Sequence, residues 1–272
     1  MHRTLLSFIT SIFLFAAFSA EAQERTDWAL KAVEYERAAF YAEDPREAAE
    51  ALAEKAFCYR QCGRYEEALA TLERISLYQL PSERVDDVLY EKELCSYLAG
   101  DWEGAASYMD EAGVSATPRR LLLDALVLGG CARWDESLAK AVELVDLRYE
   151  GEERETARHE LRDLYAMVPK LKKESQAVLR SFLPPLGHSY TGHLPEGLIA
   201  MGFDAAAVGW IVWQCLGGNW ITGILGGGVF LNAAFMGGME RSISLVDEYN
   251  RDALAGFNAV LQDVLHSHEI AE

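Results

Sequence analysis

The sequence predicts an all-α fold: a helical repeat, then a transmembrane helical hairpin and an amphipathic C-terminal helix. Three observations lead to this prediction. Apolar residues recur at helical spacing through residues 28–175, without the alternation typical of strands. A glycine–aromatic–acidic pattern recurs within this region at intervals close to one helix-turn-helix unit. Two apolar runs of about 20 residues, the length that crosses a bilayer core, follow between residues 197 and 239.

The N-terminus has the pattern of an export signal. Arg3 precedes an apolar run from Leu5 to Phe18, and Ala20-Glu21-Ala22 fits a cleavage site between small residues. The run is short for a membrane span. Residues 1–22 are therefore predicted to be a signal peptide, with an uncleaved anchor as the alternative. Both interpretations place the following domain outside the cytoplasm.

The charge and the short motifs exclude several classes of function. The 272 residues carry a formal net charge of −18, and the acidic excess extends through residues 23–180. No basic stripe is present to neutralise phosphates, so we expect no nucleic-acid partner. The sequence has no nucleophile elbow, HExxH motif or phosphate loop, so we expect no catalytic residues, cofactor or metal. The prediction is a protein that is not an enzyme.

The cysteines indicate neither a redox nor a zinc site. No CxxC motif occurs, and the odd number leaves at least one thiol free or intermolecular. For Cys58 and Cys62, small core residues are the preferred interpretation, and a bridge between neighbouring repeats stays open. The five are Cys58, Cys62, Cys95, Cys131 and Cys215.

Residues 23–175 are predicted to be the repeat domain. The segment Gly63–Leu69 is echoed by Gly100–Ala106 and more weakly by Ala132–Leu138. The glycines can end a first helix in the left-handed conformation, and the acidic residues favour the positive end of a second helix. An aromatic residue is expected to fill the wedge between paired helices, beside a small residue. The signature residues are Tyr59, Gly63, Tyr65, Ala68, Gly100, Trp102, Ala105 and Trp134.

This pattern resembles the tetratricopeptide repeat family. The first copy matches the family spacing at Ala56, Tyr59, Gly63, Tyr65, Ala68 and Leu72. The second copy has Glu93 where the family has a small residue, and the third lacks the glycine. The resemblance implies a stack whose concave face holds a peptide or another protein, with a spacer or a self-association surface as alternatives. Helices near residues 27–41 and 152–167 are expected to cap the stack.

After the repeats we expect a breaker-rich linker over residues 176–196 and a transmembrane hairpin over residues 197–239. Its Ser181–Gly192 segment is not expected to form a helix interior. In the hairpin, Gly217-Gly218-Asn219 is the predicted turn. Small residues allow close helix packing in lipid, so Gly223 and Gly227 are predicted to face Ala205 and Gly209, and a homo-oligomer through these spans stays open.

Two polar residues lie inside the predicted spans, Asp204 and Asn232. The preferred interpretation is a structural pair across the hairpin, with Asp204 protonated. An intramembrane carboxyl group also raises a functional alternative, a small oligomeric transport or channel component that uses Asp204.

The linker also resembles small membrane hairpins that begin with a P-G-x-G-Q-x-Y-x-G pattern. Pro185 replaces a family glycine and His188 replaces the glutamine, and His188 and His193 are interpreted as polar residues at a membrane entrance. A Tyr-Asn pair after the second span is similar to the ending of bacterial proteins with an export signal, helical repeats and this hairpin. The motif residues are Pro184, Gly187, His188, Tyr190, Gly192, Gly197, Tyr249 and Asn250.

The export signal, together with a two-span hairpin, places the repeats on the periplasmic side, and the resemblance implies a bacterial cell membrane, the inner one. The basic residues Lys170, Lys172, Lys173 and Arg180 favour the opposite side by the positive-inside rule. Residues 240–272 are predicted to be a separate amphipathic helical tail. The leading hypothesis is a non-enzymatic, membrane-anchored adaptor that contacts lipid and binds a protein of the cell envelope.

Overall fold

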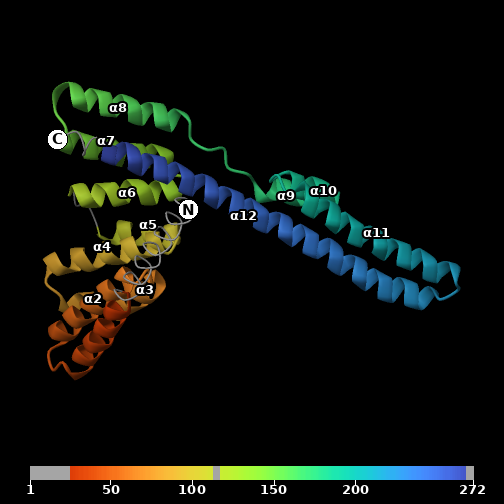
Figure 1. Ribbon diagram of the computed structural model, residues 1–272, viewed down its shortest axis with the longest axis horizontal. Coiled ribbons are helices and arrows are strands. Elements are labelled where there is room, and N and C mark those ends of the chain that lie inside the picture. Colours follow the sequence, from red (N-terminus) through yellow and green to blue (C-terminus); the bar gives the residue numbers. More distant parts are fainter. Residues whose placement is uncertain (1–24, 113–116, 268–272) are drawn as a thin grey trace, which may run out of the picture. The chain divides into compact units, whose positions relative to one another are not determined.

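The computed structural model describes residues 25–112 and 117–267, and in these ranges every extended regular element is a helix (Figure 1). The all-α prediction is confirmed. The chain divides into two compact units: one contains residues up to Tyr165 and those from Val264 onward, the other Ala166–Asp263. The predicted signal peptide lies outside the described residues.

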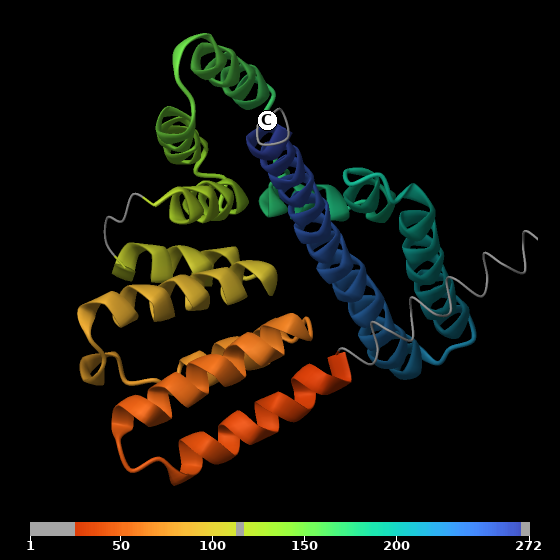
Figure 2. The same ribbon diagram turned by 60° about the vertical axis from the view of Figure 1, so that its left-hand side comes forward.

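The first unit is built from successive helix pairs. A helix over residues 25–41 precedes them, and the helix α8 (Gly151–Ala166) follows them. Figure 2 shows the pairs as successive layers along the chain. The pairs are α2 (Pro45–Gln61) with α3 (Tyr65–Leu72), α4 (Ser82–Leu98) with α5 (Trp102–Ala112), and α6 (Pro118–Gly130) with α7 (Trp134–Arg148). A 3-10 turn, η1 (Leu77–Gln79), connects the first pair to the second.

The three pairs close with the same turn. Three residues connect the two helices of each pair, and the middle one has a left-handed backbone. Its φ is +73° at Gly63, +83° at Gly100 and +56° at Ala132. The next amide donates to a carbonyl five residues earlier, for example from Arg64 to Tyr59 at 2.9 Å. This bond satisfies a helix-end carbonyl. The third pair keeps the geometry although Ala132 replaces the glycine.

The second helix of each pair begins at the aromatic residue of the signature: Tyr65, Trp102 or Trp134. Three residues later stands a small side chain that is fully buried, Ala68, Ala105 or Ser137, where the paired helices pack closely.

Trp102 also contacts the next pair. A Cβ atom added to Gly130 in α6 would lie 2.7 Å from Trp102 Cγ, so the indole ring packs directly on this backbone. The ring therefore contributes to the stacking of consecutive pairs, in addition to any role within its own pair.

The second unit contains four helices and a π-helical segment. They are α9 (Glu174–Ser181), α10 (Pro184–Ser189), α11 (Leu194–Leu216), η2 (Thr222–Gly227) and α12 (Gly228–Ser267). The expectation that Ser181–Gly192 forms no helix interior was wrong, because α10 lies within it. Pro184 and Pro185 occupy the first positions of α10, where a missing N–H costs no helical hydrogen bond. The C-terminal tail is likewise not a separate helix, because α12 runs without a break past residue 240.

Two helical stretches of this unit, Leu194–Leu216 and the one that begins at Thr222, are long and apolar enough to cross a membrane. The protein is therefore membrane-associated. Gly223 and Gly227 line the close contact: a Cβ atom on Gly223 would lie 3.0 Å from Gln214 Cβ, and one on Gly227 would clash with Ile211 Cγ1.

The prediction that Gly223 and Gly227 face Ala205 and Gly209 of α11 was wrong. Ala205 and Gly209 are exposed, and a Cβ atom on Gly209 would meet nothing within 4 Å. Ala207, between them, is fully buried. The helix therefore presents a face rotated from the one that the small-residue spacing indicates.

Candidate functional sites

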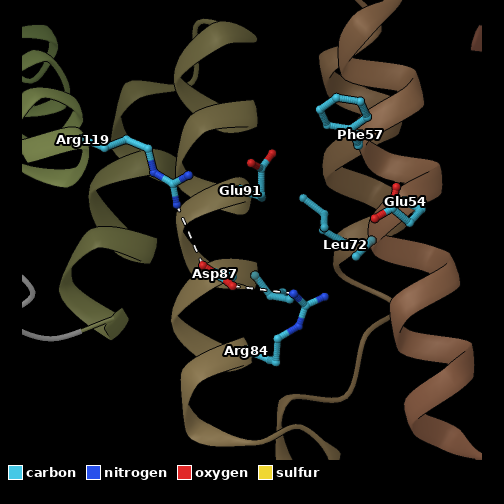
Figure 3. A pocket seen from close by; sticks show the side chains of 9 residues that line it. Glu54, Phe57, Leu72, Arg84, Asp87, Glu91 and Arg119 are labelled. Carbon is cyan, nitrogen blue, oxygen red and sulfur yellow. Dashed lines mark ion pairs between the residues drawn. The ribbon is translucent and has the colours of Figure 1, made fainter. Parts of the chain in front are cut away.

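The first candidate site is a groove across the first helices of the three pairs. It has a volume of about 380 Å³. Figure 3 shows Glu54 and Phe57 on α2 opposite charged side chains of α4, with Arg119 of α6 at the far side. Its lining residues are Ala53, Glu54, Phe57, Leu72, Arg84, Asp87, Val88, Glu91 and Arg119.

Three of the charged side chains in this groove, Arg84, Asp87 and Arg119, are loosely paired. Asp87 lies between two guanidinium groups, 3.7 Å from Arg84 Nη1 and 3.9 Å from Arg119 Nη2 (Figure 3). These side chains are each about half exposed, and exposed pairs at such distances contribute little to stability. They are available to exchange partners with an incoming ligand.

The aromatic side chain of the groove, Phe57, is positioned by contacts with Trp28 and Arg60. The ring of Phe57 is 37% exposed and meets the Trp28 ring edge-on at 5.7 Å between centroids. The Arg60 guanidinium lies 5.0 Å from the same phenyl ring while pairing with Glu91 at 3.0 Å. A partly exposed aromatic ring flanked by both signs of charge is a suitable surface for a peptide or protein side chain.

The second candidate site gathers residues of the hairpin motif around Lys172. The Asn250 carboxamide accepts the Lys172 N–H at 2.7 Å and donates to the Lys172 carbonyl at 2.9 Å. The Lys172 ammonium lies 3.7 Å from the centre of the Tyr249 ring and donates to the Tyr190 carbonyl at 2.5 Å. Arg180 lies 4.2 Å from the Tyr190 ring. We call this arrangement the lysine node.

The sequence did not reveal the lysine node. Tyr190, Tyr249 and Asn250 were recognised as motif residues, whereas Lys172 and Arg180 were interpreted only as topology signals. The only signal in the sequence was that a basic cluster and a tyrosine-rich motif occur in one chain. Residues 172 and 250 are 78 positions apart, so nothing local indicates that they meet. The two hydrogen bonds between Asn250 and the Lys172 backbone satisfy the polar groups of an extended segment that has no strand or helix partner.

The motif glycines allow close packing beside this node. A Cβ atom on Gly187 would lie 2.8 Å from Ser242 Oγ, and one on Gly197 would lie 2.9 Å from Pro185 Cα. Gly192 adopts φ of +92°. His188 is 2% exposed and shares a hydrogen bond with Ser242 Oγ at 3.2 Å. His188, interpreted from the sequence as a polar residue at a membrane entrance, thus has a buried side chain.

The two polar residues of the predicted spans, Asp204 and Asn232, are not hydrogen-bonded to each other. Asp204 and Asn232 line one cavity of about 480 Å³ together with Phe182, Gly228, Leu231 and Phe235. Asp204 Oδ1 is buried and has no hydrogen-bond partner among the described residues. The structure thus brings the two residues to one side of the hairpin without joining them.

A buried ionic cluster lies between α4, α6 and α7. Arg120 Nη2 lies 3.0 Å from Glu93 Oε2, and Arg120 Nε lies 3.8 Å from Asp124 Oδ1. Lys140 approaches the other Asp124 oxygen at 3.4 Å. Burial, together with the negative charge of Asp124, raises the pKa of Glu93 to about 8 against the opposing effect of Arg120.

Within the described ranges, no group of three or more His, Cys, Asp or Glu side chains could hold a metal ion. The five cysteines are free thiols. Comparison with known proteins gave no match to a family model, a curated protein or a solved structure.

Proposed function

We propose that this chain is a non-enzymatic, membrane-anchored adaptor of the tetratricopeptide-like class, and that its repeat groove binds a protein partner in the bacterial cell envelope. The observation that carries the proposal is the groove over α2, α4 and α6. It combines a partly exposed aromatic ring, Phe57, with loosely paired charges at Arg84, Asp87 and Arg119.

We propose further that the hairpin lies in the inner membrane and the repeats on the periplasmic side. The export signal at residues 1–22 supports this side. The basic residues that favour the opposite side have another explanation, because Lys172 and Arg180 contact tyrosine rings in the lysine node. Reporter fusions after residues 180, 218 and 272 test the topology. The fusions after 180 and 272 should report the periplasm, and the fusion after 218 should report the cytoplasm. A cytoplasmic signal from residue 180 would refute it.

The binding proposal is tested by site-specific photocrosslinking of the full chain in native membranes. A crosslinker at position 54 faces the groove, and one at position 66 on the exposed part of α3 is the matched control. The proposal expects one protein that is captured from position 54 and not from 66, and that binds the purified chain.

The variant Phe57→Ala should weaken that binding by about tenfold, the loss typical of a central aromatic contact. Equal capture from both positions, or unchanged binding by Phe57→Ala, would refute the groove as the binding surface.

A further inference from the structure

A second cavity of the hairpin unit lies between the two span helices, toward the ends that carry Glu196 and Arg241. Its volume is about 410 Å³, and its wall is apolar apart from charged and imidazole groups at one end. The apolar part comes from Ile199, Ala200 and Phe203 on α11 and from Phe230, Ala234 and Gly238 on α12. His188, Glu196 and Arg241 complete the lining. We call this cavity the hairpin cleft.

The charged end of the cleft coincides with the edge of the hydrocarbon layer. Glu196 precedes the first apolar run and Arg241 follows the second, so both lie at the same surface of an inserted hairpin. Phe203 is seven residues from Glu196, which corresponds to about 10 Å of depth at 1.5 Å per helical residue. The cleft therefore leads from the headgroup layer into the acyl-chain region.

Charged groups of both signs meet at the mouth of the cleft. Arg241 Nε donates to Glu196 Oε2 at 3.1 Å, and Arg241 Nη1 lies 3.9 Å from Glu248 Oε2. The Arg241 and Glu196 side chains are 45% and 43% exposed, so both can bind a further group. A guanidinium group is suited to a phosphate, and a carboxylate to an ammonium group that still carries N–H donors.

These features select one class of ligand. An acyl chain fits the apolar wall, a phosphate fits Arg241, and a primary ammonium group fits Glu196 and Glu248. An anionic phospholipid without an amine has the phosphate but offers no cation to the two carboxylates. A quaternary ammonium headgroup has the same charges but no N–H to donate.

We propose that the hairpin cleft binds a phospholipid whose zwitterionic headgroup carries a primary ammonium, with the phosphate on Arg241 and the ammonium on Glu196. The proposal rests on insertion of the hairpin and is independent of the partner-binding role of the groove. The lipid then fills the space between the two spans next to the buried His188.

The test is lipid retention by the purified full chain. The chain is reconstituted in bilayer discs that contain equal amounts of phosphatidylethanolamine, phosphatidylcholine and phosphatidylglycerol, released, and analysed by native mass spectrometry. We expect preferential retention of phosphatidylethanolamine. Glu196→Gln should reduce that preference by about tenfold, because a charge-assisted hydrogen bond is lost. The matched control is Glu240→Gln, an exposed residue outside the cleft.

A second pair of variants tests the apolar wall. Ala234→Phe fills the cleft and should abolish retention of all three lipids, whereas Ala206→Phe on the exposed side of α11 should not. Equal retention of the three lipids by the unmodified chain would overturn the proposal, as would an unchanged preference in Glu196→Gln. Extraction of the chain from membranes by sodium carbonate would also overturn the proposal, because the hairpin would then not be inserted. Occupation of the cleft by a second copy of the chain would overturn it as well.

Discussion

Asn250 binds both backbone polar groups of Lys172, accepting its N–H at 2.7 Å and donating to its carbonyl at 2.9 Å. This relationship joins α12 to the extended segment that precedes α9. It gives the tyrosine–asparagine motif a structural role, because the neighbouring residue Tyr249 receives the ammonium group of the same lysine.

The first prediction concerns this contact. Asn250→Ala removes both hydrogen bonds, at a cost of about 1 kcal/mol each. The segment around Lys172 should then open more often, and trypsin should cleave after Lys170, Lys172 and Lys173 several times faster under native conditions. The rate is measured by mass spectrometry of the digest. Asp252→Asn, an exposed change on the same helix, is the control. An unchanged cleavage rate in Asn250→Ala would contradict the prediction.

The buried cluster predicts a pH dependence of stability. The pKa of Glu93 is about 8 in the folded chain, against an ordinary value of 4.5. The folded state therefore binds the proton more tightly than the unfolded state, so the contribution of Glu93 is fully present below pH 4.5 and is lost as pH rises through 8. Thermal unfolding of the full chain in detergent, followed by circular dichroism from pH 5 to 9, should show the midpoint falling with pH.

Glu93→Gln should flatten this profile, because the amide imitates the protonated acid and does not titrate. The Glu36→Gln variant separates the effect from general charge repulsion. Hydrogen bonds from Arg74 and Lys55 lower the pKa of Glu36 to about 2, so its contribution is constant from pH 5 to 9 and is lost only at acidic pH. Equal slopes in Glu93→Gln and the unmodified chain would rule out Glu93 as the source.

The third prediction concerns the hairpin contact. Gly227→Ala places a methyl group against Ile211, whereas Gly226→Ala places it in open space on the same helix. Only the first substitution should separate the spans. Spin labels at positions 206 and 229, both exposed, report the change as a longer or broader distance distribution in lipid. Identical distributions for the two variants would mean that Gly227 does not set the helix spacing.

The fourth prediction concerns the third turn. Ala132 has φ of +56°, a conformation that costs a residue with a side chain roughly 1 kcal/mol. Ala132→Gly should relieve this cost and stabilise the α6–α7 pair by up to about 1 kcal/mol. Glycine is the residue that the other two turns have at this position. Hydrogen exchange at the α7 amides measures the gain. Gly63→Ala is the reciprocal variant and should destabilise the α2–α3 pair. A faster exchange in Ala132→Gly would refute the account.

The sequence determined the helical elements because their signals are local. Helical periodicity, the positions of glycine and proline, and the length of the apolar runs each act within a few residues, and the all-α prediction followed from them. The aromatic residues at 65, 102 and 134 coincide with helix starts for the same reason. The short helix α10 was missed although its signal was local as well, since prolines at the first helical positions are compatible with a helix.

Only the tertiary structure decided which side chains meet. The face that α11 turns toward its partner depends on packing of both helices, so small-residue spacing alone selected Ala205 and Gly209 instead of the region around Ala207 and Ile211. Lys172 and Asn250 are distant in the chain, and nothing local to either residue requires the other. The groove and the hairpin cleft likewise combine residues from several helices. The sequence by itself therefore determined the elements and their order, and long-range packing created the sites.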